Sequence, residues 1–340
     1  MVDVGAYYYL WYDKDQWRDY RYVHTPVRKF YDSSDTEVIS QHIQWAKEHG
    51  IKFFLVSWDG PEEEGKKIDR NLRNTFLTNS FSRDIQFAIF YESEARLKKP
   101  GQPLDVMNLS DPNKVNRLVD DFNYLAENYF KDDRYYRVHG KPLVALYLSR
   151  AYMHTIRDVE TAILKLRRNE LYLVGDEVYW HTVVRDRLRP WKRPTLGNRE
   201  EFVRLYDAVT AYNMHEEPSS AEKESFDKDF DSRVEKEYGN WLKALPEPVE
   251  FIPNVIPGFD DTKIPAERRP EKHTPLRRSL GRFDLQLQLA ARNVSKGNLL
   301  LITSFNEWHE DTQIEPAENY ETPAEPLSYL KALKRGRTLR

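Results

Sequence analysis

A single repeating pattern limits the fold of this chain more than any other feature. Apolar runs rich in β-branched and aromatic residues alternate with segments whose apolar residues keep helical spacing. The runs predict strands over residues 4–10, 51–57, 85–91, 142–148, 171–174, 208–212, 249–254 and 298–304. The segments between them predict helices over residues 36–49 and 66–78, from residue 111 onward, and near residues 153–168, 220–245, 276–294 and 326–334. Strands that alternate with helices form parallel βαβ units.

Eight such units indicate a closed barrel rather than an open sheet. An open doubly wound sheet usually has a glycine-rich first turn, whereas residues 7–12, YYYLWY, contain no glycine. A chain of 340 residues is long for one domain, but α/β barrels of this length are common. We therefore predict the α/β class, with residues 1–340 forming a single catalytic (β/α)8 TIM barrel with elaborated βα loops. The connection over residues 175–199 is long and polar and is expected to form a substantial loop.

Composition excludes several classes of protein. The net charge of −3, with both signs mixed, provides no basic surface for nucleic acid. The absence of cysteine excludes disulfides, thiolate metal sites and a cysteine nucleophile. No run of about 18 apolar residues is present that would span a membrane. Because residues 2–10 already form a predicted strand, we expect no signal peptide. These features predict a soluble protein, either cytoplasmic or secreted with its signal removed, and leave the oligomeric state open.

In α/β barrels, active sites form at the carboxyl ends of the strands. Polar and aromatic residues follow most of the predicted strands, and their flat rings suit the faces of sugars, although most of the 13% aromatic residues are expected to fill the core. The strand-end residues include Trp11, Tyr12, His24, Trp58, Asp59, Tyr91, Glu92, Tyr147, Asp176, Glu177, Tyr179, Tyr212, Asn213, His215, Asn254 and residues 306–310. They predict a substrate site at this end of the barrel.

The segment after the last strand is the richest in chemistry. Glu307 and Glu310 are three residues apart, a spacing that places both side chains on one face of a helical turn. Two such carboxylates can act as acid and base if their surroundings separate their pKa values, as glycoside cleavage requires. Trp308 is expected to desolvate a neighbouring carboxyl and raise its pKa. The alternative is a solvated helix start, where acidic residues are favoured by the helix dipole.

Two other chemistries were weighed for this segment. His309 together with either glutamate could bind a divalent metal ion, but the sequence has no HExxH or similar spacing of two histidines. A serine hydrolase is disfavoured because no G-x-S-x-G elbow occurs. The acid and base pair is therefore the favoured interpretation.

Residues 303–316, TSFNEWHEDTQIEP, closely resemble a motif of glycoside hydrolase family 99, the endo-α-1,2-mannosidases and endo-mannanases. Other segments resemble the same family in the same order along the chain. They are residues 30–35, His42, residues 50–51, 55–58 and 141–143, Tyr147, Asp207, Tyr212 and residues 251–262. The resemblance thus extends from about residue 5 to residue 316.

This resemblance implies a retaining, endo-acting α-glycosidase, endo-α-mannosidase-like, that hydrolyses an internal bond of an oligosaccharide or polysaccharide. Glu307 would deprotonate the sugar 2-hydroxyl so that O2 attacks the anomeric carbon and forms a 1,2-anhydro sugar. Glu310 would protonate the leaving oxygen and then activate water. This scheme is an exception to the usual carboxylate nucleophile. No metal or organic cofactor is implied.

The resemblance also implies which residues line the sugar subsites, and the strand ends extend that set. By resemblance these residues are Tyr8, Trp58, Tyr147 and Tyr212. The strand-end positions and the motif add Trp11, His24, Glu92, Asn306, Trp308 and His309 as candidate substrate-binding residues.

The sequence departs from the family pattern at three places. Asp311 stands where the family has glycine, and a third carboxylate there is expected to raise the pKa of Glu310. The family's arginine after the seventh strand has no aligned match, so Arg268 or Arg269 is expected to replace it. Residues 59–64 are also more acidic than the family pattern. These changes leave open a polysaccharide-building glycosyltransferase, a label that some relatives carry, and a non-catalytic glycan-binding barrel.

Overall fold

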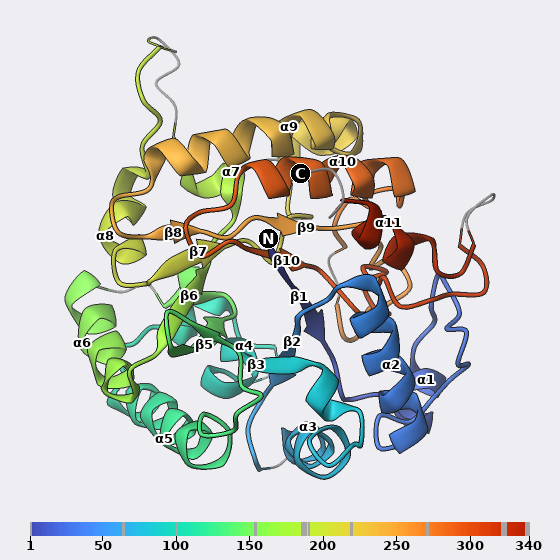
Figure 1. The fold of residues 1–340 in the computed structure, drawn as a ribbon. Helices are drawn as coiled ribbons and strands as arrows, with labels where there is room; N and C mark the ends of the chain where they lie inside the picture. Colours follow the sequence, from blue (N-terminus) through green and yellow to red (C-terminus); the bar gives the residue numbers. More distant parts are fainter. Residues whose placement is uncertain are drawn as a thin grey trace.

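The computed structural model of the chain is a parallel β-barrel surrounded by helices (Figure 1). It describes residues 2–62, 65–99, 101–152, 155–184, 189, 191–217, 220–269, 272–320 and 325–336. The strands are β1 (Asp3–Tyr8), β2 (Phe53–Trp58), β3 (Gln86–Tyr91), β4 (Arg137–Val138), β5 (Lys141–Leu146), β6 (Tyr172–Asp176), β7 (Ala208–Thr210), β8 (Glu250–Phe251), β9 (Asn254–Val255) and β10 (Leu299–Ile302). They follow the order β8-β7-β6-β5-β3-β2-β1-β10-β9, with β4 paired antiparallel to β5 outside this path.

The barrel closes through the short segment that contains β8 and β9. Its first half, β8, pairs with β7, and its second half, β9, pairs with β10. Pro253 lies between the halves and has no N–H to donate, but its carbonyl accepts the backbone N–H of Leu301 at 3.0 Å. The strands therefore occupy eight barrel positions, and the predicted (β/α)8 architecture is confirmed.

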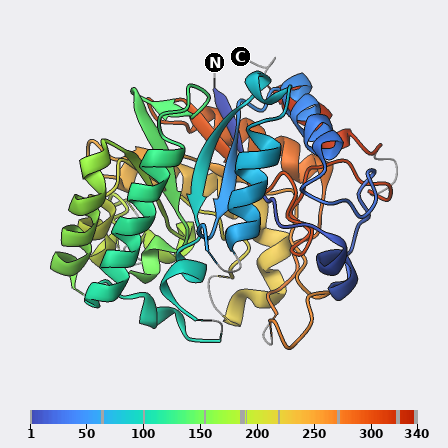
Figure 2. The same ribbon diagram turned by 90° about the horizontal axis from the view of Figure 1, so that it is seen from below.

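Helices cover the outside of the barrel (Figures 1 and 2). The longer ones are α2 (Thr36–His49), α3 (Gly65–Asn71), α5 (Pro112–Asn128), α6 (Ile156–Leu166), α9 (Lys223–Ala244), α10 (Leu280–Arg292) and α11 (Ser328–Gly336). Short helices are α1 (Lys14–Asp19), α4 (Ser93–Leu97), α7 (Tyr179–Thr182) and α8 (Glu200–Val203). α1 and α4 each lie between a barrel strand and the next long helix, whereas α7 and α8 lie in the connection between β6 and β7, so all four elaborate the βα loops.

Local signals explain where the long helices begin and end. Asp35 caps α2 by accepting the N–H of Glu37, and Gly50 ends it at φ 87°, a left-handed conformation that favours glycine. Asp111 caps α5, with Pro112 at its first position. The bounds predicted for α2 are those observed, because both caps are visible in the sequence.

Other predicted bounds differ from the structure. The helix predicted over residues 66–78 divides into α3 and a π-helical turn over Leu72–Phe76. The helix predicted from residue 153 begins at Ile156, and residues 153–154 lie outside the described part of the chain. The loop predicted over residues 175–199 contains α7 and an antiparallel bridge between Val184 and Thr195.

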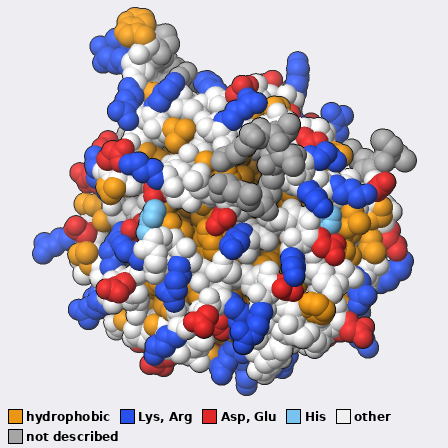
Figure 3. All heavy atoms as spheres, viewed as in Figure 1, with side chains coloured by type: hydrophobic (Ala, Val, Ile, Leu, Met, Phe, Trp, Pro, Cys, Tyr) orange, Lys and Arg blue, Asp and Glu red, His pale blue; other side chains and the backbone are white. Residues whose placement is uncertain are grey.

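The surface viewed in Figure 3 carries basic and acidic side chains intermixed. No described helix is long and apolar enough to cross a membrane. Within the described ranges, no group of three or more His, Cys, Asp or Glu side chains is arranged to hold a metal ion.

Candidate active site

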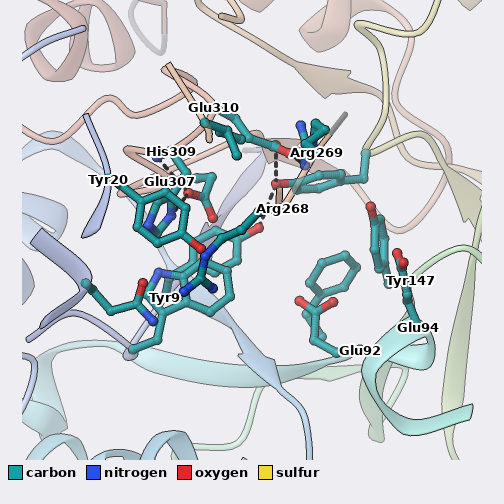
Figure 4. A pocket seen from close by; sticks show the side chains of 15 residues that line it. Tyr9, Tyr20, Glu92, Glu94, Tyr147, Arg268, Arg269, Glu307, His309 and Glu310 are labelled. Atoms are coloured by element: carbon teal, nitrogen blue, oxygen red, sulfur yellow. Dashed lines mark hydrogen bonds and ion pairs between the residues drawn. The ribbon is translucent and has the colours of Figure 1, made fainter. Parts of the chain in front are cut away.

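A cavity of about 320 Å³ lies where the barrel strands end, and it contains both glutamates of the motif (Figure 4). Its walls come from residues that end or directly follow β1, β3, β5, β7 and β10, and from the loop after β9. The lining residues are Tyr9, Trp11, Gln16, Tyr20, Phe90, Glu92, Glu94, Tyr147, Tyr212, Ile264, Arg268, Arg269, Glu307, His309 and Glu310. The structure thus brings together seven of the predicted residues: Trp11, Glu92, Tyr147, Tyr212, Glu307, His309 and Glu310.

Glu307 is nearly buried, on the side of this cavity that is lined by aromatic rings. Its residue is 3% exposed, and its Oε1 accepts the backbone N–H of His309 at 2.9 Å. The same oxygen lies 2.8 Å from His309 Nδ1 and accepts the Tyr12 hydroxyl at 3.4 Å. Burial raises the pKa of Glu307 above its usual value, the contacts with His309 oppose this shift, and the charge of Glu310 adds to it. A carboxylate of raised pKa is a stronger base than an ordinary one.

Glu310 faces a charged wall instead. Its Oε1 accepts a hydrogen bond from Arg269 at 2.7 Å, and its Oε2 accepts the Tyr212 hydroxyl at 3.4 Å. Arg269 also donates to Asp261 at 3.1 Å. The Tyr212 oxygen lies 2.7 Å from that of Tyr9. Because Tyr212 gives its one proton to Glu310, Tyr9 is the donor of this second bond, and the hydroxyls form a chain that ends on Glu310.

The turn that carries the two glutamates is held by its own polar side chains. Residues 308–311 form a hydrogen-bonded turn rather than the start of a helix. Ser304 donates its backbone N–H to the carbonyl of Thr312 at 2.8 Å, and its hydroxyl accepts the N–H of Glu307 at 2.8 Å. The three-residue spacing therefore brings Glu307 and Glu310 to one cavity, although not through a helix.

A third carboxyl, Glu92, lines the same cavity below the pair. It accepts the Ser57 hydroxyl at 2.7 Å. Burial raises its pKa well above the usual value, and the neighbouring charges of Asp59 and Glu94 add to that shift. Burial thus favours the protonated form of this carboxyl over the charged form. Tyr147 and Phe90 lie beside it with ring centroids 5.3 Å apart and supply an apolar wall.

Trp308 and Asn306 point into the protein rather than into the cavity. Trp308 donates its indole N–H to Glu315 at 2.8 Å, and Glu315 is fully buried. Asn306 accepts the backbone N–H of Tyr9 at 2.8 Å and donates to its carbonyl at 2.9 Å. Trp308 therefore turns away from the cavity that holds Glu307 and bonds to Glu315, while Asn306 holds the turn against Tyr9, directly after β1.

Tyr8, His24 and Trp58 also do not line the cavity. The Tyr8 hydroxyl lies 2.9 Å from His42 Nδ1, and Trp58 donates to Asp69 at 2.9 Å. Both side chains are fully buried on the outer side of the barrel wall, where strands meet helices. His24 Nδ1 lies 2.6 Å from Asp311. Their expected contact with sugar is not supported by these positions, because side chains alternate along a strand and Tyr9, not Tyr8, faces the cavity.

Asp311, which stands where the family motif has glycine, lies in a left-handed turn. Asp311 has φ 53°, in the left-handed region that favours glycine. Its carboxylate is bound by His24, by Gln313 at 3.0 Å and by Arg278 at 3.4 Å. Burial alone would raise the pKa of Asp311, but Arg278 and His24 outweigh it and lower that pKa. Asp311 is thus held in a separate polar cluster.

Both arginines that the sequence offered as a replacement for the family's arginine line the cavity. Arg269 contacts Glu310, whereas the guanidinium of Arg268 lies 4.8 Å from the centre of the Tyr20 ring. Other lining residues were missed by the sequence analysis. Tyr20 and Gln16 come from the loop and short helix after β1, for which the sequence offered no strand-end signal. Asp176 lies behind the cavity and accepts the N–H of Tyr212 at 2.8 Å. Its burial raises its pKa to about 6.

Comparison with known proteins identifies the family. The model of the family described as glycosyltransferase WbsX matches residues 12–332. The chain belongs to this WbsX family. Among curated proteins, a human glycoprotein endo-α-1,2-mannosidase-like protein is 25% identical over 324 residues, covering 90% of this chain and 62% of its own length. The chain thus spans about three-fifths of that relative.

Solved structures show that the WbsX family chain shares the fold of glycoside hydrolases. A glycoside hydrolase-like protein aligns with a TM-score of 0.73 at 23% identity, covering 98% of this chain and 93% of its own. The family 99 endo-α-mannosidase of Bacteroides thetaiotaomicron aligns with a TM-score of 0.66 at 20% identity, covering 99% and 98%. The resemblance to family 99 endo-α-mannosidases is confirmed, and the chain is related to them.

Proposed function

We propose that this protein is a retaining, endo-acting α-glycosidase that cleaves an internal bond next to an α-linked mannose of a glycan. One observation carries the proposal: Glu307 and Glu310 line one sugar-sized cavity, in surroundings of opposite character. Glu307 is buried among aromatic rings and His309, and Glu310 is held by Arg269 and Tyr212. Two identical groups held so differently suit two different proton transfers.

In the proposed reaction, Glu307 removes the proton of the 2-hydroxyl, and O2 attacks the anomeric carbon. Glu310, which must be protonated when the substrate is bound, gives this proton to the leaving oxygen as the glycosidic bond breaks, which forms a 1,2-anhydro sugar. Glu310 then takes a proton from water, the water attacks the anomeric carbon, and Glu307 returns a proton to O2. Two inversions at the anomeric carbon give net retention. The raised pKa of Glu307 supports its role as the base.

A glycosyltransferase is the second candidate, because the family model that matches the chain is described by that activity. The same two carboxyls would serve transfer if an acceptor hydroxyl replaced water in the second step. The chemistry of Glu307 and Glu310 is common to both candidates, and the acceptor separates them.

Digestion of a panel of α-mannose-containing glycans tests the proposal. We expect wild-type protein to release oligosaccharides with a new reducing end, detected by mass spectrometry, and Glu310→Gln to release none. A longer glycan product in the presence of an added sugar acceptor, without hydrolysis, would favour the transferase. Equal release by wild type and Glu310→Gln would reject the assignment of Glu310.

A substrate without the 2-hydroxyl tests the proposed intermediate. We expect the 2-deoxy form of a cleaved glycan to bind but to resist cleavage, because no O2 is present to attack. Cleavage of the 2-deoxy form at a rate near that of the parent glycan would contradict the anhydro-sugar route and favour direct attack by a carboxylate.

A further inference from the structure

A second cavity of about 530 Å³ adjoins the candidate active site. Glu92, Glu94, Tyr147 and Arg268 line both cavities, so the two cavities adjoin at these side chains. The second cavity is otherwise bounded by the loops after β2 and β3, including α4. A glycan that lies across Glu307 and Glu310 therefore has a path into this second space for a neighbouring sugar.

The second cavity is lined by charged side chains, most of which pair with one another. Glu62 pairs with both Arg96 and Arg117, and Arg96 also pairs with Asp121. Glu94 pairs with Lys98 at 2.7 Å. Each of these pairs leaves little charge available to a ligand.

Two groups in the part shared by both cavities differ from these pairs. Glu92 accepts the Ser57 hydroxyl at 2.7 Å, and no cation of the described residues lies within ion-pair distance of its carboxyl. Arg268 is exposed, and no carboxylate of the described residues lies within ion-pair distance of its guanidinium. Its described partner is the ring of Tyr20, with the guanidinium carbon 4.8 Å from the ring centre. Figure 4 shows the Arg268 side chain in the cavity, with its guanidinium beside Tyr20.

The neighbouring Arg269 shows what distinguishes Arg268. Arg269 is occupied by Glu310 at 2.7 Å and Asp261 at 3.1 Å. Arg268 has the same planar fork of donors, which binds carboxylates and phosphates in pairs of hydrogen bonds. In the described residues this fork contacts Tyr20, to which it also hydrogen-bonds, rather than a carboxylate. Lys99, also exposed, lines the second cavity and adds another cation on the same path.

We propose that Arg268 binds an acidic substituent of the substrate, so that the glycan cleaved here is an acidic one whose charged sugar lies beside the cleaved mannose. This inference rests on the proposed function and adds the class of substrate. The shared chemistry is a pair of anionic oxygens, supplied either by the carboxylate of a uronic acid or by a phosphate ester.

Calorimetric titration of the full chain tests this assignment. The probes are three forms of one α-linked mannose oligosaccharide: with a uronic acid beside the scissile mannose, with that uronic acid reduced to the alcohol, and with a phosphate ester at the same sugar. The protein carries Glu307→Gln, which prevents cleavage and leaves the pairing of Arg269 with Glu310 in place. Arg268→Gln and Arg268→Lys are made in this background, with Arg157→Gln, an exposed residue of α6 outside both cavities, as the matched control.

We expect at least one acidic form to bind about tenfold more tightly than the reduced form, with the preference weakening as salt is raised. Arg268→Gln should abolish most of this preference, Arg268→Lys should keep part of it, and Arg157→Gln should keep all of it. Whether the uronic acid or the phosphate form is preferred identifies the source of the anion.

Equal binding of the acidic and reduced forms, or a preference that Arg268→Gln leaves intact, would overturn the inference. If the wild-type protein nevertheless cleaves these glycans, the proposed function stands without it. If the wild type cleaves none of the forms and binds none of them, the proposed function itself fails, and the inference fails with it.

Discussion

The two sides of the cavity place a glutamate side chain in opposite surroundings, aromatic on one side and charged on the other. On the side next to β1, Glu307 is surrounded by Tyr12 and His309, whose rings stack with centroids 5.4 Å apart, and has no cation fixed beside it in the described residues except His309 when protonated. On the side of the loop after β9, Glu310 is bound by Arg269, which is anchored on the buried Asp261. The motif therefore brings the two carboxyls to one cavity, and the side chains that face them determine the burial and the charged partners of each.

The largest effects should come from removing either carboxyl. We expect Glu307→Gln and Glu310→Gln each to lower kcat/KM by about 10²–10⁴-fold, the usual contribution of a general acid or base. Glu201→Gln, an exposed residue of α8, is the matched control and should act like wild type. Steady-state kinetics on a cleaved glycan measures this. Loss of less than about tenfold in either cavity variant would remove that glutamate from the chemistry.

The next largest loss of activity should come from removing Arg269, the cation beside Glu310. Arg269→Gln removes the cation that orients Glu310 and leaves Asp261 with His273, 3.0 Å away, as its remaining described side-chain partner. We expect kcat/KM to fall by about 10–100-fold, because misplacing a catalytic group by even about 1 Å is costly. Arg268→Gln should cost less on a neutral glycan, since Arg268 does not contact Glu310. Equal losses from the two substitutions would contradict the separate roles of these neighbours.

The activity that depends on Glu307, on the aromatic side of the cavity, should change with pH. Because Glu307 acts as a base, activity should fall as the pH drops through its pKa, and burial places that pKa above the usual value of about 4.3. His309 opposes the shift, so His309→Phe should raise the pKa further and move the acidic limb of the kcat/KM profile to higher pH. A limb that stays in place or moves to lower pH would show that Glu307 does not govern it.

The smallest effect on activity should come from Trp308, which lies behind Glu307 and points away from the cavity. Trp308→Phe removes one donor to Glu315, which keeps bonds from Tyr31 at 2.8 Å and with His42 at 3.0 Å. We expect the free energy of unfolding to fall by about 1–2 kcal/mol in urea titration, with kcat/KM changed only about twofold. Tyr31→Phe should behave similarly. A large loss of activity without loss of stability would mean that Trp308 contacts substrate after all.

Some of this arrangement could be predicted from the sequence because its signals are local. The cap at Asp35, the glycine at position 50 and the strand runs are all short-range, so the barrel and its order were predictable. The position of Glu307 and Glu310 after the last strand followed from the barrel rule. The sequence pattern after the last strand did not show that Trp308 points toward Glu315. This orientation depends on a hydrogen bond to a buried side chain seven residues further along the chain.

Other parts depend on contacts that no local pattern encodes. Whether Tyr8 or Tyr9 faces the cavity depends on where β1 ends and how it is registered against β10. The choice between Arg268 and Arg269 depends on the path of the loop after β9, where Asp261 fixes Arg269 and Tyr20, from a distant segment, contacts Arg268. Such long-range pairings require the folded structure.

The division of labour between the two glutamates can be measured with a substrate that needs no acid. A mannose-containing α-glycosyl fluoride loses fluoride without protonation of the leaving group, so the first turnover should require Glu307 but not Glu310. We predict that Glu310→Gln releases a first equivalent of fluoride at a rate close to that of wild type, whereas Glu307→Gln is slowed by at least about 10²-fold. Equal impairment of both variants on the fluoride would contradict the assignment of base and acid to these two residues.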